Sequence, residues 1–76
     1  MKYNVYKISY FNRHETHQLV KSNLTEGEVN KFIDDEASRL NYGLYRYWEV
    51  NGEKFYDCGS ITYIVKIVDQ NVKISC

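Results

Sequence analysis

Two histidines three residues apart, His14 and His17, are the first side chains that suggest metal chemistry. On a strand, positions i and i+3 point to opposite faces, so the two imidazoles would not share an ion there. In a turn they could meet, but Zn²⁺ takes three or four ligands, and neither cysteine lies near them in sequence. The pair also lacks the HExxH spacing of zinc proteases. We therefore expect no metal site.

Cys58 is a second candidate, as a nucleophile. A reactive thiol needs a lowered pKa, which a helix N-terminus or a neighbouring positive charge provides. The residue beside Cys58 is Asp57, whose negative charge disfavours the thiolate. We predict that Cys58 is a structural, partly buried residue. Two cysteines are too few for a disulfide framework, so we expect a reducing compartment, the cytoplasm.

Carboxylates are concentrated in residues 25–40. This segment has five acidic side chains and two basic ones, Lys31 and Arg39, so its net charge is −3. Paired catalytic carboxylates need a cleft, whereas the polar face of an amphipathic helix faces solvent. We interpret this face as solvated or as a docking surface for a basic protein, formed by Glu28, Asp34 and Asp35. Because the four glycines fall at caps or turns, no phosphate-binding loop is indicated. We expect neither enzymatic activity nor a cofactor.

Aromatic side chains are the most distinctive feature, since the chain has eight tyrosines, three phenylalanines and one tryptophan. Most of them fall on predicted strands: Tyr3, Tyr6, Tyr10, Phe11, Tyr45, Tyr47, Trp48, Phe55, Tyr56 and Tyr63. Exposed tyrosines can simply stiffen strands, but tyrosine and tryptophan are also enriched at binding hot spots. Stacking of the aromatic rings on nucleic-acid bases is a further alternative, which the zero net charge of the chain disfavours. We predict a protein interface.

The dipeptide Asn51-Gly52, between two β-rich runs, predicts a two-residue type I′ hairpin. Its register would pair aromatic with aromatic and acid with base: Trp48 with Phe55, Tyr47 with Tyr56, Glu49 with Lys54 and Arg46 with Asp57. Gly59-Ser60 predicts a second turn, of type II′, that places Tyr56 opposite Tyr63. A bulge at Gly59 is the alternative and would shift that pairing by one residue.

A helix is predicted over residues 25–40. Thr25 and Glu28 fit a capping box at its start, and Asn41 or Gly43 is expected to adopt the left-handed conformation at its end. The apolar stripe comprises Val29, Phe32, Ile33, Ala37 and Leu40.

Strands are predicted for residues 3–11, for 16–21 after a turn at 12–15, for both arms of the Asn51-Gly52 hairpin, and for 61–68, with a frayed edge strand at 72–76. The chain is therefore predicted to be one α+β domain, residues 1–76, in the order ββαβββ. Five to six antiparallel strands would carry one amphipathic helix on one face.

The predicted register also divides the aromatic residues between two faces. Tyr45, Tyr47, Tyr56 and Tyr63 share one face, and Trp48 and Phe55 share the other. A helix of roughly 16 residues is about 24 Å long and covers part of one face. Because Trp48 and Phe55 have no phenolic hydroxyl, we expect the helix on their side and the tyrosine face open. The reverse assignment remains an alternative, because Ile61, Val65 and Ile67 share the tyrosine face.

The composition rich in lysine, asparagine, tyrosine and isoleucine, the small size and the hairpin–helix–hairpin plan resemble small accessory proteins of bacterial phages and mobile elements. Residues 56–63 (YDCGSITY) are similar to a D-x-G-S strand ending found in some of them. The resemblance covers this general plan and that segment. It implies stoichiometric inhibition of a host or defence enzyme, as by anti-CRISPR proteins, and it assigns no binding residues.

We therefore predict a non-enzymatic binding protein that occludes a host or defence protein in the cytoplasm of a bacterial host. One alternative is a nucleic-acid-binding regulator, which would need its basic residues gathered on one face. These are Lys2, Lys7, Arg13, Lys21, Arg46, Lys54, Lys66 and Lys73. Another alternative is a structural homo-oligomer of phage origin. We expect no membrane contact, since no apolar run approaches the roughly 20 residues of a span.

Overall fold

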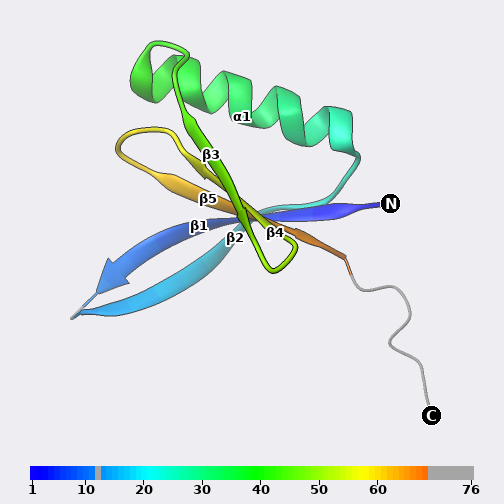
Figure 1. Ribbon diagram of the computed structural model, residues 1–76, viewed down its shortest axis with the longest axis horizontal. Coiled ribbons are helices and arrows are strands. Elements are labelled where there is room, and N and C mark those ends of the chain that lie inside the picture. The colour runs from blue at the N-terminus through cyan, green and yellow to red at the C-terminus, as the bar shows by residue number, and fades with distance from the viewer. Residues whose placement is uncertain (12, 69–76) are drawn as a thin grey trace.

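The computed structural model describes residues 1–11 and 13–68, so the strand predicted at 72–76 lies outside the described residues. The described chain is an α+β fold in the predicted order, with one helix packed against a five-stranded antiparallel sheet. Figure 1 shows the elements: β1 (Tyr3–Phe11), β2 (His14–Leu24), α1 (Glu26–Asn41), β3 (Arg46–Val50), β4 (Glu53–Asp57) and β5 (Thr62–Ile67).

The strands lie in the order β2-β1-β5-β4-β3. The N-terminal hairpin β1–β2 and the C-terminal strands β3–β4–β5 are thus joined by antiparallel pairing of β1 with β5, in which Val5 lies opposite Val65. Strands β2 and β3 form the two edges of the sheet.

The Asn51-Gly52 hairpin is confirmed. Both residues have positive φ, 51° for Asn51 and 83° for Gly52, as a type I′ turn requires. The five cross-strand pairs of β3 and β4 follow the predicted register, including Trp48 with Phe55 and Tyr47 with Tyr56.

The turn at Gly59-Ser60 is also confirmed, and the bulge alternative is excluded. Tyr56 lies opposite Tyr63, and the Cys58 N–H donates to the Ile61 carbonyl at 2.9 Å. Gly59 has φ 95°, and a Cβ atom built there would lie 3.2 Å from Cγ of Asn41. The left-handed backbone conformation therefore requires glycine here, and the close approach of the Asn41 side chain also favours it.

The capping box at the start of α1 is confirmed. The Thr25 hydroxyl accepts from the Glu28 N–H at 3.2 Å, and Glu28 Oε1 accepts from the Thr25 N–H at 2.8 Å. The end of the helix differs in part from the prediction. Gly43 is left-handed as expected, but Tyr42 is too, with φ 56°, whereas Asn41 remains helical.

Strand β2 begins earlier and ends later than the predicted strand over 16–21. We expected His14 and Glu15 to lie in a turn, but Glu15 already pairs with Tyr10 in the β1–β2 ladder. The polar character of this segment reflects the exposed edge of a sheet rather than a loop. The Tyr10 hydroxyl donates to Glu15 across the strands at 3.4 Å.

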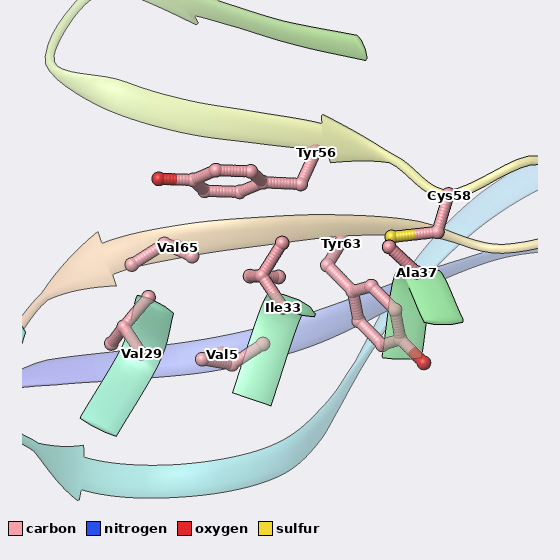
Figure 2. Close-up of a cluster of buried hydrophobic side chains, with 8 residues drawn as sticks. All are labelled: Val5, Val29, Ile33, Ala37, Tyr56, Cys58, Tyr63 and Val65. Carbon is pink, nitrogen blue, oxygen red and sulfur yellow. The ribbon is translucent and has the colours of Figure 1, made fainter. Parts of the chain in front are cut away.

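The core lies between α1 and the tyrosine face of the sheet (Figure 2). Its buried side chains come from the sheet and from one side of the helix: Val5, Val29, Ile33, Ala37, Tyr56, Cys58, Tyr63 and Val65. Our prediction that α1 packs on the Trp48 and Phe55 face is therefore wrong, and the reverse assignment is correct.

The physical reason is visible at Tyr63, which is 3 % exposed. Its hydroxyl donates to Oε1 of Glu36 on α1 at 2.7 Å, so the polar end of the side chain is satisfied while the ring is buried. The ring also makes an edge-on contact with Phe32, with centroids 5.2 Å apart. The hydroxyl of Tyr63 can therefore be buried, because Glu36 on the helix accepts its hydrogen bond.

Candidate protein-binding surface

The face of the sheet opposite α1 carries a row of five large apolar side chains that crosses all five strands. Figure 1 shows that the helix lies to one side of the sheet. We call this row the open-face row, and it follows the register pairs in the order Leu19, Tyr6, Ile64, Phe55 and Trp48.

The open-face row is buried at its centre and exposed at its ends. Ile64 has no exposed area, whereas Leu19 is 51 % and Trp48 is 40 % exposed. The Trp48 and Phe55 rings stack with centroids 5.4 Å apart and planes 6° from parallel. Stacking holds the indole against the Phe55 ring, so this end of the row is a rigid aromatic surface that loses little conformational entropy on binding.

Charges of both signs flank the row. Lys66 lies over the Tyr6 ring, 5.0 Å from its centroid, and its ammonium group is 3.7 Å from Glu53. At the β2 edge, His17 Nε2 lies 2.6 Å from Glu15. An apolar centre with a mixed polar rim is the composition of protein–protein interfaces.

The strand lysines and arginines are divided between the two faces. Lys7 and Lys54 lie opposite Tyr63 and Val65, which places them on the helix side. Arg46 and Lys66 alternate onto the open face. This division gives the described strands no single basic face of the kind that nucleic-acid binding uses.

Two of the four predicted interface tyrosines lie in the core. Tyr56 is 8 % exposed and Tyr63 is 3 % exposed. Burial raises the pKa of Tyr56 to about 12. Burial, and after it the hydrogen bond to Glu36, also raises the pKa of Tyr63. Because α1 covers both side chains, the tyrosine face as a whole is not the open one.

The other two predicted tyrosines, Tyr45 and Tyr47, are about half exposed on the helix side of the sheet. Their ring centroids lie 5.7 and 5.1 Å from that of Tyr56. The structure thus brings these three tyrosines together, with Tyr56 innermost. A role for Tyr45 and Tyr47 in partner binding stays a prediction.

The predicted acidic residues Glu28, Asp34 and Asp35 are exposed on α1. The Glu28 carboxylate belongs to the capping box, and the hydrogen bonds from Thr25 lower its pKa. Asp35 forms an i,i+4 ion pair with Lys31 at 3.1 Å. Glu28 and Asp35 thus have partners within the helix, and a docking role for the three acids stays a prediction.

Glu36 is a structural residue that our sequence reasoning missed. Its carboxylate accepts a hydrogen bond from Tyr63 and forms an ion pair with Arg39. Both hydrogen bonds lower the pKa of Glu36, and the one from Arg39 has the larger effect. The sequence carried a signal, because Glu36 lies four residues after Phe32 and four before Leu40, within the apolar stripe. An acid in that position requires a partner from the element that the helix covers.

Burial and the arrangement of possible ligands decide the two candidates for chemistry, the Cys58 thiol and a metal site. Cys58 has no exposed area, so it is buried more completely than the partly buried thiol that we predict from the sequence. Burial, and to a lesser extent the negative charge of Asp57, raises the pKa of its thiol. Within residues 1–11 and 13–68, no cluster of three or more histidine, cysteine, aspartate or glutamate side chains could hold a metal ion. In the same described part, no helix has the length and apolar content needed to cross a membrane.

Comparisons of the chain with known protein families, with curated proteins and with solved structures gave no match.

Proposed function

We propose that this protein is a non-enzymatic binding domain that docks onto a protein partner through the open face of its sheet. The observation that carries the proposal is the open-face row, which runs across five strands on the side away from α1. Solvent-facing sheet positions are normally polar, so an apolar row there favours a binding role.

The chemistry of the face favours a protein over a nucleic acid. Phosphate backbones are bound by an excess of lysine and arginine, whereas the net charge of this chain is zero. On the open face, Lys66 is opposed by Glu53, and Arg46 lies opposite Asp57. A protein surface with an apolar centre and charges of both signs at its rim complements this arrangement.

The resemblance to small phage accessory proteins supplies the class of partner. On that basis the partner is a host or defence protein in the bacterial cytoplasm, and binding inhibits it by occluding its working surface. A standard interface buries about 800 Å² on each partner, which a sheet of five strands is broad enough to provide.

The test compares capture of partner proteins by the wild-type chain and by matched variants. Trp48→Ala removes the exposed aromatic end of the open-face row, and Leu19→Asp places a charge at the other end. Asp34→Asn changes the exposed face of α1 and serves as the control. Each variant is first checked for a cooperative unfolding transition. Any protein captured from a bacterial lysate is then purified, and its affinity is measured by titration.

We expect Trp48→Ala and Leu19→Asp each to weaken binding by about 30-fold, which corresponds to a hot spot of about 2 kcal/mol. The Asp34→Asn variant should bind like the wild type. Loss of binding in Asp34→Asn, with both row variants unaffected, would move the interface to the acidic face of α1. Tight, salt-dependent binding of random duplex DNA would instead support the regulator alternative.

A further inference from the structure

Strand β3 is the most exposed strand of the sheet. All five of its residues are exposed, both those on the helix side and those on the open side. Tyr47, on the helix side, is 49 % exposed, while Trp48 and Val50, on the open side, are 40 % and 48 % exposed. Strand β3 ends the sheet order, so no described strand pairs with its outer side. Within residues 1–11 and 13–68, its outward main-chain groups form no further backbone hydrogen bond.

The two edges of the sheet differ in how they are protected. Strand β2 has register shifts near Lys21 and an irregular residue, Asn23, with φ 60°. Its sequence, HETHQLVKSNL, is also largely polar. Bulges of this kind hinder an edge strand from pairing with another strand. Strand β3 pairs regularly with β4 along its whole length. Its sequence, RYWEV, contains no proline, and its two charged residues, Arg46 and Glu49, have opposite signs.

Geometry identifies the main-chain groups that β3 presents outward. In the Asn51-Gly52 turn, the residues that flank the loop, Val50 and Glu53, form the hydrogen-bonded pair. Hydrogen bonding alternates along an antiparallel pair, so every second residue of β3 points its N–H and C=O away from β4. Those residues are Tyr47 and Glu49.

We propose that β3 pairs antiparallel with β3 of a second copy of this chain, about a two-fold axis at Trp48. This register pairs all five residues. It places Tyr47 opposite Glu49 of the second copy, which matches the outward main-chain groups on both sides. It also sets the two Trp48 residues opposite each other and Arg46 opposite Val50. The product is a continuous ten-stranded sheet with both helices on one side.

The side chains of β3 fit a second copy because the strand is self-complementary. The Tyr47 hydroxyl already donates to Glu49 within the chain at 3.3 Å, and the symmetric register offers the same donor and acceptor twice more across the interface. No two like charges lie directly opposite each other. The zero net charge also removes overall repulsion between copies.

The two-fold axis is perpendicular to the sheet, so both open-face rows lie on the same side of the dimer. They would meet at the two Trp48 rings and form one continuous band. This inference does not depend on the proposed function, since an edge pair can form whatever the open face binds.

The first experiment is sedimentation equilibrium of the full chain over a range of concentrations. We expect a concentration-dependent dimer. Glu49→Pro removes an outward N–H while leaving the hydrogen bonds to β4, and proline is tolerated on such an edge. It should raise the dimer dissociation constant at least tenfold, whereas the control Glu49→Gln, which keeps the N–H, should dimerise normally.

The second experiment does not depend on the fold of the proline variant. In a chain with Cys76 replaced by serine, Trp48→Cys places two thiols opposite each other at a non-hydrogen-bonded pair, where Cα atoms are about 4.5 Å apart. That separation suits a disulfide, so mild oxidation should give a covalent dimer. Val50→Cys lies opposite Arg46 rather than its own copy, and it should give little cross-linking.

Three results would overturn the proposal. The first is a wild-type chain that stays monomeric at every concentration. This result would count against the dimer even if β3 were found to bind a strand of another protein. The second is a dimer that Glu49→Pro leaves intact. The third is equal cross-linking of the two cysteine variants, which would show random collision rather than the symmetric register.

Discussion

Removing the Tyr63 hydroxyl should destabilise the protein through a single hydrogen bond between helix and sheet. Tyr63→Phe keeps the buried ring and its edge-on contact with Phe32, and it deletes only the donor to Glu36 at 2.7 Å. A hydrogen bond to a charged group contributes about 1.5–3 kcal/mol. A domain of this size has a total stability of about 4–11 kcal/mol, so the loss is readily measured.

The effect should depend on pH in a direction fixed by Glu36. Its pKa is lowered in the folded state by Arg39 and Tyr63. The stability that this carboxylate contributes is therefore present above its unfolded pKa and is lost as the pH falls through its folded pKa. The difference in unfolding free energy between wild type and Tyr63→Phe should shrink over that acidic range.

The assay is urea unfolding followed by circular dichroism, for the wild type, Tyr63→Phe, Glu36→Gln and the double variant. At neutral pH the double-mutant cycle should give a coupling energy of about 0.5–3 kcal/mol between the two side chains. A coupling near zero, or a Tyr63→Phe variant as stable as the wild type at neutral pH, would refute the contact on which the assignment of the buried face depends.

Three further predictions concern the elements that hold the fold. Thr25→Ala removes the acceptor for the Glu28 N–H and should lower stability by about 1 kcal/mol, seen as a fall of roughly 4–8 °C in Tm. Gly52→Val places a branched side chain at φ 83° and should cost about 1–3 kcal/mol, and an unchanged Tm would contradict the type I′ turn. Because burial raises the pKa of Tyr56 to about 12, the free energy of unfolding should fall as the pH rises from about 10 towards 12, and a constant free energy of unfolding over that range would contradict its burial.

Local signals in the sequence were sufficient to predict the elements and most of their register. Asn51-Gly52 determined the pairing of β3 with β4, because a two-residue type I′ turn leaves no freedom in which residues face each other. Thr25 and Glu28 marked the start of α1 for the same kind of reason, since the capping box depends on residues within one turn. Both signals act over a few residues and need no knowledge of the tertiary fold.

The face that the helix covers was not predictable in the same way. Both faces of the β3–β4 hairpin carry aromatic pairs, so the choice between them depends on contacts between segments far apart in the sequence. The decisive ones are the Tyr63–Glu36 hydrogen bond and the pairing of Val5 with Val65. The absence of a hydroxyl on Trp48 and Phe55 does not decide which face is buried, whereas Glu36 within the apolar stripe does, because it supplies the acceptor for a buried tyrosine.

The candidate binding surface lies on the face of the sheet opposite the tyrosine face. Tyr56 and Tyr63 stabilise the core, and the surplus of aromatic side chains that suggested an interface now appears on the other side, at Tyr6, Phe55 and Trp48. One helix covers one face of the sheet, so the aromatic side chains of the other face are left for a binding partner.

The most direct test of the open face as a docking surface uses the single tryptophan of the chain, Trp48, as the reporter. Replacing it by 5-fluorotryptophan gives one fluorine NMR resonance, which is free of signals from any partner. When a purified partner captured by the protein is added, we expect this resonance to shift and to lose its sensitivity to the solvent. A stable complex in which the Trp48 resonance stays at its free position, as accessible to solvent as before, would contradict it.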